Sequence, residues 1–354
     1  MRETGTVKVI NSSSEPKVLP PGLYENATVD LTSAPGLGPL RPTVRPTAAY
    51  LDQKPGTSGL RKKTKQFMQE HYLHNFVQAT FNALPQNGTD LTNGALLLGG
   101  DGRFYNIVAI QQIIKMAAAN GVRRIVVGQN GLLSTPAVSA IIREKGPDWQ
   151  RAYGAFILTA SHNPGGLEED FGIKYNCENG GPAPEKLTDA IYEITRTIKQ
   201  VKICENFPDV DLAQLGSTVI KSSDGYQSVV VEVISSTAHH IELLKTIFDF
   251  PALRKLIHRS DFSLKYDCMH GVQGPYAREV LVNELGASAD CLMNAVPKED
   301  FNGGHADPNL TYARDLCDVM GVDKAGLPIP TTQVPPCFGA AADGDADRNM
   351  ILGR

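Results

Sequence analysis

Residues 155–166 are Ala-Phe-Ile-Leu-Thr-Ala-Ser-His-Asn-Pro-Gly-Gly, an apolar run that passes directly into a polar turn. The run Ala155–Leu158 predicts a buried strand, and the Pro-Gly-Gly that follows predicts a turn. We therefore expect Ser161 at the carboxyl end of a strand, the end that faces the ligand crevice in open α/β sheets. The segment is not the G-x-S-x-G nucleophile elbow, because Thr159 and Asn163 occupy its two glycine positions. A reactive serine and a plain turn both remain open on this segment alone.

Apolar strands alternate with amphipathic helices on both sides of this segment, which predicts βαβ units. We therefore assign the chain to the α/β class, with successive domains whose mixed sheets are sandwiched by helices. The expected strands are 96–99, 124–128, 155–158, 226–234, 264–267, 338–342 and 350–352. The expected helices are 107–118, 135–145 with Thr135 as N-cap, 184–199, 237–248, 252–258, 275–284 and 311–320.

Composition shifts divide the chain into three parts. Residues 1–46 are rich in Pro, Ser, Thr and Gly and predict a poorly ordered extension. A stretch of non-native sequence from a wrong gene start is the alternative for this part. Residues 47–222 and 223–354 are the two expected α/β domains, and the proline-rich stretch 321–336 is expected as a surface loop.

Charge and cysteine content narrow the class of protein. The formal net charge is -4 and the sequence pI is near 6.1, which argues against a nucleic-acid partner. No run approaches ~18 consecutive apolar residues, so we expect no membrane partner. The amino terminus lacks the apolar region of a secretory signal. The six scattered cysteines indicate free thiols in a reducing compartment, so we expect a cytoplasmic protein.

The loop Asp343-Gly-Asp-Ala-Asp-Arg-Asn349 places three carboxylates at alternate positions. Such an arrangement can converge on one hard cation, and it leaves room for water and substrate oxygens, as Mg²⁺ requires beside a phosphate. An EF-hand is excluded because Arg348 stands at the sixth position, which needs glycine. Arg348 could steady a phosphoryl group. An exposed acidic turn is the alternative.

A third segment that could take part in chemistry is Lys54-Pro-Gly-Thr-Ser-Gly-Leu-Arg-Lys-Lys63. Glycines and small hydroxyls followed by three cations could cradle an anion. The segment lacks the P-loop spacing G-x-x-x-x-G-K-[ST]. Taken alone, a solvated basic turn explains it as well.

In this order along the chain, the three segments resemble the α-phosphohexomutases of the eukaryotic phosphoglucomutase type. Further stretches resemble the same family: Phe171-Gly-Ile-Lys-Tyr-Asn176, Asn179-Gly-Gly-Pro-Ala-Pro-Glu185, Asp267-Cys-Met-His-Gly-Val-Gln-Gly-Pro275 and Asp307-Pro-Asn-Leu-Thr311. The resemblance implies that 47–222 is domain I with the phosphoserine loop and that 223–354 is domain II with the metal loop. It extends from about residue 46 to the end of the sequence.

The resemblance also implies an activity, the interconversion of glucose 1-phosphate and glucose 6-phosphate through glucose 1,6-bisphosphate in carbohydrate metabolism. Ser161 would carry the phosphoryl group, and one Mg²⁺ would be held by Ser161, Asp343, Asp345 and Asp347. The family's remaining catalytic positions match His162, Lys174 and Arg348. Its substrate- and phosphate-binding positions match Ser58, Arg61, Lys174, Asp347 and Arg348.

Two departures from the family pattern affect these expectations. Ala346 stands where many members have glycine, so the loop must either avoid a positive φ there or tolerate alanine at a small cost. The family has four domains, and the third and fourth, with the sugar-recognition loop, are not in this sequence. We therefore expect this chain alone to have little or no mutase activity and the full-length protein to be a monomer. A non-catalytic scaffold relative, or a phosphatase using the same phosphoserine, is the alternative.

Overall fold

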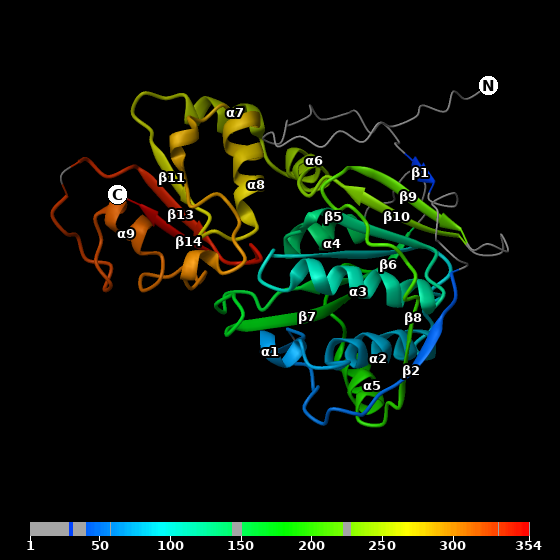
Figure 1. The fold of residues 1–354 in the computed structure, drawn as a ribbon. Coiled ribbons are helices and arrows are strands. Elements are labelled where there is room, and N and C mark those ends of the chain that lie inside the picture. The colour runs from blue at the N-terminus through cyan, green and yellow to red at the C-terminus, as the bar shows by residue number, and fades with distance from the viewer. Residues whose placement is uncertain are drawn as a thin grey trace, which may run out of the picture.

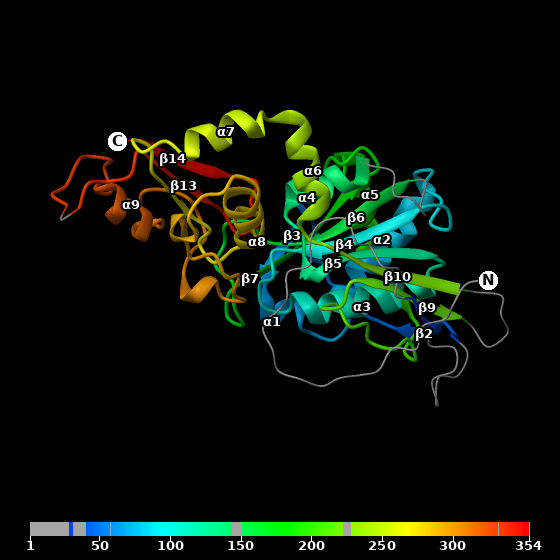
Figure 2. The same cartoon turned by 90° about the horizontal axis from the view of Figure 1, so that it is seen from above.

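The computed structural model describes residues 28–30, 40–56, 58–143, 151–221, 228–331 and 333–353. The chain forms two lobes that lie side by side in both views (Figures 1 and 2). The larger lobe contains an eight-stranded sheet and the smaller lobe a four-stranded sheet. The carboxyl end of the chain lies in the smaller lobe.

The larger sheet has the strand order β1-β9-β10-β5-β4-β6-β7-β3. Its centre is parallel, because β4 pairs in parallel with both β5 and β6, and β10 pairs in parallel with β5. Its β7 and β3 edge is antiparallel. The strands are β1 (Thr28–Asp30), β3 (Leu60–Lys63), β4 (Ala95–Gly100), β5 (Arg124–Leu132), β6 (Ala152–Leu158), β7 (Asp170–Cys177), β9 (Gly216–Lys221) and β10 (Ser228–Ile234).

Helices cover both faces of this sheet, so β4 and β6 at its centre are buried at consecutive positions rather than at alternate ones. In β4, Leu96 and Leu98 pack into the core on one face, and Ala95 and Leu97 pack into the core on the other. The first face carries α2 (Tyr72–Gln86), α3 (Asn106–Ala119) and α5 (Glu185–Thr195), and the second carries α4 (Thr135–Arg143) and α6 (Ala238–Ile247) (Figure 1). Burial of each large side chain contributes roughly 1.5–3 kcal/mol.

The smaller sheet has the order β12-β11-β13-β14, with β11 parallel to β12 and β13 and with β14 antiparallel to β13. Its strands are β11 (Leu264–Asp267), β12 (Leu292–Met293), β13 (Phe338–Ala342) and β14 (Asn349–Gly353). Its helices are α7 (Phe250–Ile257), α8 (Gln273–Ala277), a π-helix (Arg278–Glu284) and α9 (Arg314–Met320). Two 3₁₀ turns lie at Ala289–Cys291 and Phe301–Gly303. The hairpin β13–β14 carries the acidic loop at its tip. The remaining elements are α1 (Thr64–Phe67) and the pair β2 (Thr43–Pro46) and β8 (Gln200–Ile203).

The expected α/β class with mixed sheets is confirmed, but part of the expected amino-terminal extension belongs to the fold. Thr43–Pro46 pairs with β8, and Leu40 is buried in the core. Thr28–Asp30 pairs with β9. Residues 1–27 and 31–39 lie outside the described residues, as do the expected boundary residues 222 and 223. The larger sheet continues past that boundary, because β10 (Ser228–Ile234) is one of its strands.

Several helix ends differ from expectation for local reasons. Ser134, not Thr135, caps α4, because its Oγ accepts a hydrogen bond from the backbone N–H of Ala137 at 3.2 Å. α9 starts at Arg314 because the Asn309 side chain accepts bonds from the two N–H groups of Thr311 and Tyr312 and closes a turn. α5 stops at Thr195 rather than at residue 199, and most of the helix expected at 275–284 is a π-helix. The end expected for α4 at residue 145 and the start expected for β10 at residue 226 lie outside the described residues.

Two further observations concern the whole described chain. None of the helices in the described ranges combines the length and the apolar character that a bilayer crossing requires. The six cysteines all lie in those ranges, and no disulfide joins any two of them.

Candidate active site

Ser161 lies at the carboxyl end of β6, where the sequence analysis predicted it. Its side chain is almost fully buried, at 2% exposure, and its backbone has a φ of 56°. A positive φ is uncommon for a residue other than glycine and recurs at active sites. The Ser161 N–H donates to Thr159 Oγ1 at 2.7 Å, and Thr159 Oγ1 donates to Asp101 Oδ2 at 2.5 Å. These bonds fix the turn that presents the Ser161 hydroxyl.

Arg103 is a second anchor of this turn, and the sequence analysis missed it. Its guanidinium donates to the carbonyl oxygens of Ser161 and Asp170, each at 2.8 Å, and it pairs with Asp101 at 2.9 Å. Its side chain is fully buried. It also lies over the ring of Phe301 from the smaller lobe, 5.2 Å from the ring centroid. The sequence did contain a signal for this anchor, because the charged residues Asp101 and Arg103 directly follow the apolar strand β4.

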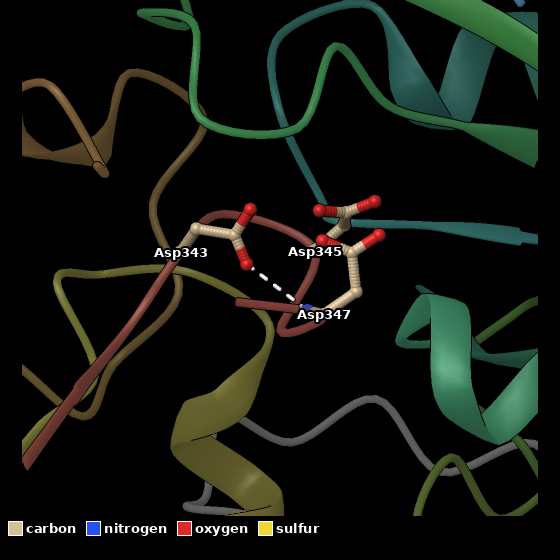
Figure 3. A group of neighbouring side chains, drawn as sticks. All are labelled: Asp343, Asp345 and Asp347. Atoms are coloured by element: carbon tan, nitrogen blue, oxygen red, sulfur yellow. Dashed lines mark hydrogen bonds between the residues drawn. The ribbon is translucent and has the colours of Figure 1, made fainter. Parts of the chain in front are cut away.

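The acidic loop gathers its three carboxylates in one place (Figure 3). One potential ligand atom from each of Asp343, Asp345 and Asp347 lies within 4.8 Å of the others. Asp343 Oδ1 accepts the backbone N–H groups of Asp347 and Arg348, each at 3.0 Å, which closes the loop. Ala346 has a φ of 62°, so the loop tolerates alanine in the left-handed region rather than avoiding that conformation.

The electrostatics of this loop fit a bound cation. Burial, together with the charge of Asp345, raises the pKa of Asp343 to about 7. Burial acts in the same direction on Asp345, but the charge of Lys174 and the hydrogen bonds from Thr135 and Lys174 lower the pKa of its carboxyl. Asp345 Oδ1 is buried and has no hydrogen-bond partner among the described residues. Three carboxylates, one with a free buried oxygen, could hold a hard divalent cation.

The Ser161 hydroxyl lies against this loop. Its Oγ donates to Asp343 Oδ2 at 2.9 Å and accepts from Arg348 Nη2 at 3.1 Å. His162 Nδ1 lies 3.4 Å from the same oxygen and also contacts Arg348 Nη2. Burial, followed by the charge of Arg348, lowers the pKa of His162. The expected serine and metal loops therefore meet at one oxygen atom.

The other expected site residues differ in how closely they approach. Lys174 on β7 is nearly buried, and its Nζ lies 3.1 Å from Asp345 Oδ2 and 4.0 Å from Asp347 Oδ2. Arg61 on β3 is half-buried, burial lowers its pKa, and its Nε has no hydrogen-bond partner in the described ranges. Ser58 is exposed, and within the same ranges it makes no hydrogen bond to Ser161 or to the three aspartates.

Comparison with known families fits this arrangement. Residues 52–202 match the model of the phosphoglucomutase/phosphomannomutase α/β/α domain I, and residues 238–354 match that of domain II. The chain belongs to the phosphoglucomutase/phosphomannomutase family. Its β10 falls between the two matched regions, although it is part of the larger sheet.

Individual relatives cover most of the chain. The cytoplasmic phosphoglucomutase of Solanum tuberosum is 59% identical over 310 residues, which is 87% of this chain and 52% of the relative. A cytoplasmic phosphoglucomutase of Zea mays is 56% identical over 314 residues, 88% of this chain and 52% of the relative. The chain thus spans about half the length of the curated relatives it matches.

A solved structure of the family has the same arrangement of elements. The open form of the exocytosis-sensitive phosphoprotein pp63/parafusin, a phosphoglucomutase from Paramecium, matches with a TM-score of 0.84 and 45% identity. The match covers 90% of this chain and 55% of that structure. Among the described residues, those that match the domain I model belong to the larger lobe. Those that match the domain II model belong to the smaller lobe, except for α6, which covers the larger sheet.

Proposed function

We propose that this chain carries the phosphoserine and metal half of a cytoplasmic phosphoglucomutase, an intramolecular phosphotransferase that interconverts glucose 1-phosphate and glucose 6-phosphate. The relatives named above are cytoplasmic phosphoglucomutases with 56–59% identity. The observation that carries the proposal is the position of Ser161 Oγ, which lies 2.9 Å from Asp343 and 3.1 Å from Arg348. A nucleophilic oxygen, an acidic triad and a guanidinium meet there.

In the proposed reaction, the bond between the phosphorus atom and Ser161 Oγ breaks as a sugar hydroxyl forms a new bond to phosphorus. The sugar hydroxyl loses its proton, Ser161 Oγ gains one as it becomes a hydroxyl again, and glucose 1,6-bisphosphate results. The bisphosphate then returns its other phosphoryl group to Ser161. Such transfers need positioning and charge neutralisation more than covalent catalysis.

The chain's own residues supply these requirements. Arg348 holds the Ser161 oxygen and balances charge on the phosphoryl group. His162 is placed to hold or move a proton at Ser161 Oγ, and burial together with the charge of Arg348 lowers its pKa. Lys174 and Arg61 add positive charge on the sheet side of the site, where incoming phosphate would gather. Ser58 is proposed to line the substrate path.

Asp343, Asp345 and Asp347, with the Ser161 oxygen, would hold one Mg²⁺. When bound, Mg²⁺ would neutralise charge on the phosphoryl group and align it for transfer. The three aspartates are its proposed protein ligands, and Lys174 limits the net negative charge of the loop.

The chain spans about half of its relatives, so we propose a hexose phosphate as the substrate of the whole protein and a monomer as its state. Contacts to parts of the sugar remote from the reacting phosphate supply much of the transition-state stabilisation in such reactions. We therefore propose that these residues on their own support phosphoryl exchange at Ser161 and little steady turnover.

The test is to incubate the chain with Mg²⁺ and glucose 1,6-bisphosphate and to locate any phosphoryl group by intact and peptide mass spectrometry. We expect one phosphoryl group on Ser161, and none on the Ser161→Ala variant. A folded chain that binds Mg²⁺ but gains no phosphoryl group would instead favour a non-catalytic scaffold.

A further inference from the structure

Thr135, the first residue of α4, contacts the central aspartate of the acidic loop twice. Its Oγ1 donates to Asp345 Oδ2 at 2.7 Å, and its backbone N–H donates to the Asp345 carbonyl oxygen at 3.0 Å. The two residues lie 210 positions apart and belong to different lobes. Thr135 therefore fixes both the backbone and the side-chain orientation of Asp345.

The second donor to the same carboxylate oxygen is Lys174, whose Nζ lies 3.1 Å from Asp345 Oδ2. Oδ2 thus receives one neutral and one charged hydrogen bond, whereas buried Oδ1 has no hydrogen-bond partner in the part of the chain that the structure describes. A carboxylate held in this way has one oxygen available to a cation. Turning it so that both oxygens face a cation would break the Thr135 bond and bring the cation closer to the Lys174 ammonium.

The number of available oxygens matters for ion choice. Mg²⁺ requires near-octahedral coordination with short bonds, and one oxygen from each carboxylate satisfies it. Ca²⁺ is larger, takes more oxygen ligands and often binds a carboxylate through both oxygens. Groups that orient a metal ligand without touching the metal commonly change its affinity by 10–100-fold.

We propose that Thr135 is a positioning residue that holds Asp345 with Oδ1 alone turned to the cation, and that it thereby selects Mg²⁺ over Ca²⁺. This inference rests on the magnesium site in the proposed function. It assigns to the larger lobe a direct part in shaping a metal loop whose aspartates all come from the smaller lobe.

The test uses the unphosphorylated full chain. Bound Mn²⁺ is measured by electron paramagnetic resonance and displaced with Mg²⁺ or Ca²⁺, which yields the affinity of each ion. Thr135→Val removes the hydroxyl at nearly constant volume, and Thr135→Ser restores it. Thr188→Val is the matched control, because within the described ranges the Thr188 hydroxyl donates only to the carbonyl oxygen of Glu185, at 3.0 Å.

We expect Thr135→Val to weaken Mg²⁺ binding about tenfold and Ca²⁺ binding by a clearly smaller factor. Thr135→Ser and Thr188→Val should keep the wild-type ratio of Mg²⁺ affinity to Ca²⁺ affinity. Equal weakening of both ions, or no weakening, overturns the inference. If Thr135→Val does not fold, Thr135→Ala removes the same hydroxyl without adding a methyl group. A wild-type chain that binds none of the three ions overturns the magnesium site itself, which separates that failure from the failure of this inference.

Discussion

Arg348 Nη2 lies 3.1 Å from Ser161 Oγ, although the two residues belong to different lobes and are 187 positions apart in the chain. Arg348 is nearly half exposed, with 46% of its side-chain surface accessible, whereas Ser161 is buried. The guanidinium therefore reaches from the surface into the site, where it can meet both the serine oxygen and an incoming phosphate.

Replacing Arg348 should impair phosphoryl transfer far more than folding. Because it removes a charged donor at the reacting oxygen, Arg348→Met should slow phosphoryl uptake at Ser161 about 100-fold. The rate is measured by quenched-flow mass spectrometry with glucose 1,6-bisphosphate. Arg259→Met is the control, because Arg259 is an exposed arginine paired with Asp261. Equal rates in the wild type and Arg348→Met would rule out the proposed role.

Arg103 should behave in the opposite way, as a stability residue. Arg103→Met leaves the buried Asp101 carboxylate without its cation and should lower the free energy of unfolding by about 3–5 kcal/mol. Adding Asp101→Asn should recover part of that loss, because the buried charge is then gone. Urea denaturation measures each value. The comparison is the pair of Lys115 and Asp209, whose side chains are 23% and 69% exposed. Lys115→Met should lower the free energy of unfolding by less than about 1 kcal/mol. Similar losses for Arg103→Met and Lys115→Met would contradict this prediction.

The metal loop offers a matched pair of backbone predictions. Ala346 has a φ of 62°, so Ala346→Gly should stabilise the chain by up to about 1 kcal/mol, less the packing of one methyl group. A Cβ at Gly344 would lie 2.6 Å from the Ser161 carbonyl oxygen, so Gly344→Ala should destabilise the chain and weaken cation binding. Thermal unfolding with and without Mg²⁺ measures both. Shifts of the same sign in the two variants would contradict the assignment of strain.

His74 on α2 should make the chain less stable in mild acid. Burial lowers the pKa of His74 from 6.5 to about 4. Between these values the unfolded chain binds the proton and the folded chain does not, so stability is full above pH 6.5 and falls as the pH drops toward 4. Because the side chain is partly exposed, we expect a contribution of only about 1 kcal/mol between pH 7 and pH 5. His74→Gln should flatten the pH dependence of urea unfolding in that range, and an unchanged slope would contradict the prediction.

The sequence predicted the parts of the site that are local in the chain. An apolar strand followed by a polar turn was enough to place Ser161 at a strand end, and the alternating carboxylates were enough to predict that Asp343, Asp345 and Asp347 converge. The alternation of strands and helices was likewise enough for the α/β class. These signals depend on neighbouring residues and on the direction of the backbone.

The residues that were missed act over long distances in the sequence. Arg103 bonds a carbonyl 58 positions away, and Thr135 bonds a carboxylate 210 positions away. Thr135 was predicted to be a helix cap because threonine before proline suits that position, yet Ser134 caps the helix and leaves the Thr135 hydroxyl for Asp345. No local pattern distinguishes these two uses of a threonine hydroxyl. Part of residues 1–46 was misjudged for a similar reason, because β2 is stabilised by pairing with the distant β8.

The most direct test of the central claim is to follow the phosphoryl group as it leaves Ser161. The chain phosphorylated on Ser161 is mixed with glucose 1-phosphate and Mg²⁺, and phosphoserine, glucose 1,6-bisphosphate and inorganic phosphate are quantified over time. The account predicts that phosphoserine is lost with matching formation of glucose 1,6-bisphosphate, and that removal of Mg²⁺ stops the transfer. Loss of phosphoserine as inorganic phosphate, or a phosphoserine that sugar phosphate leaves untouched, would contradict it.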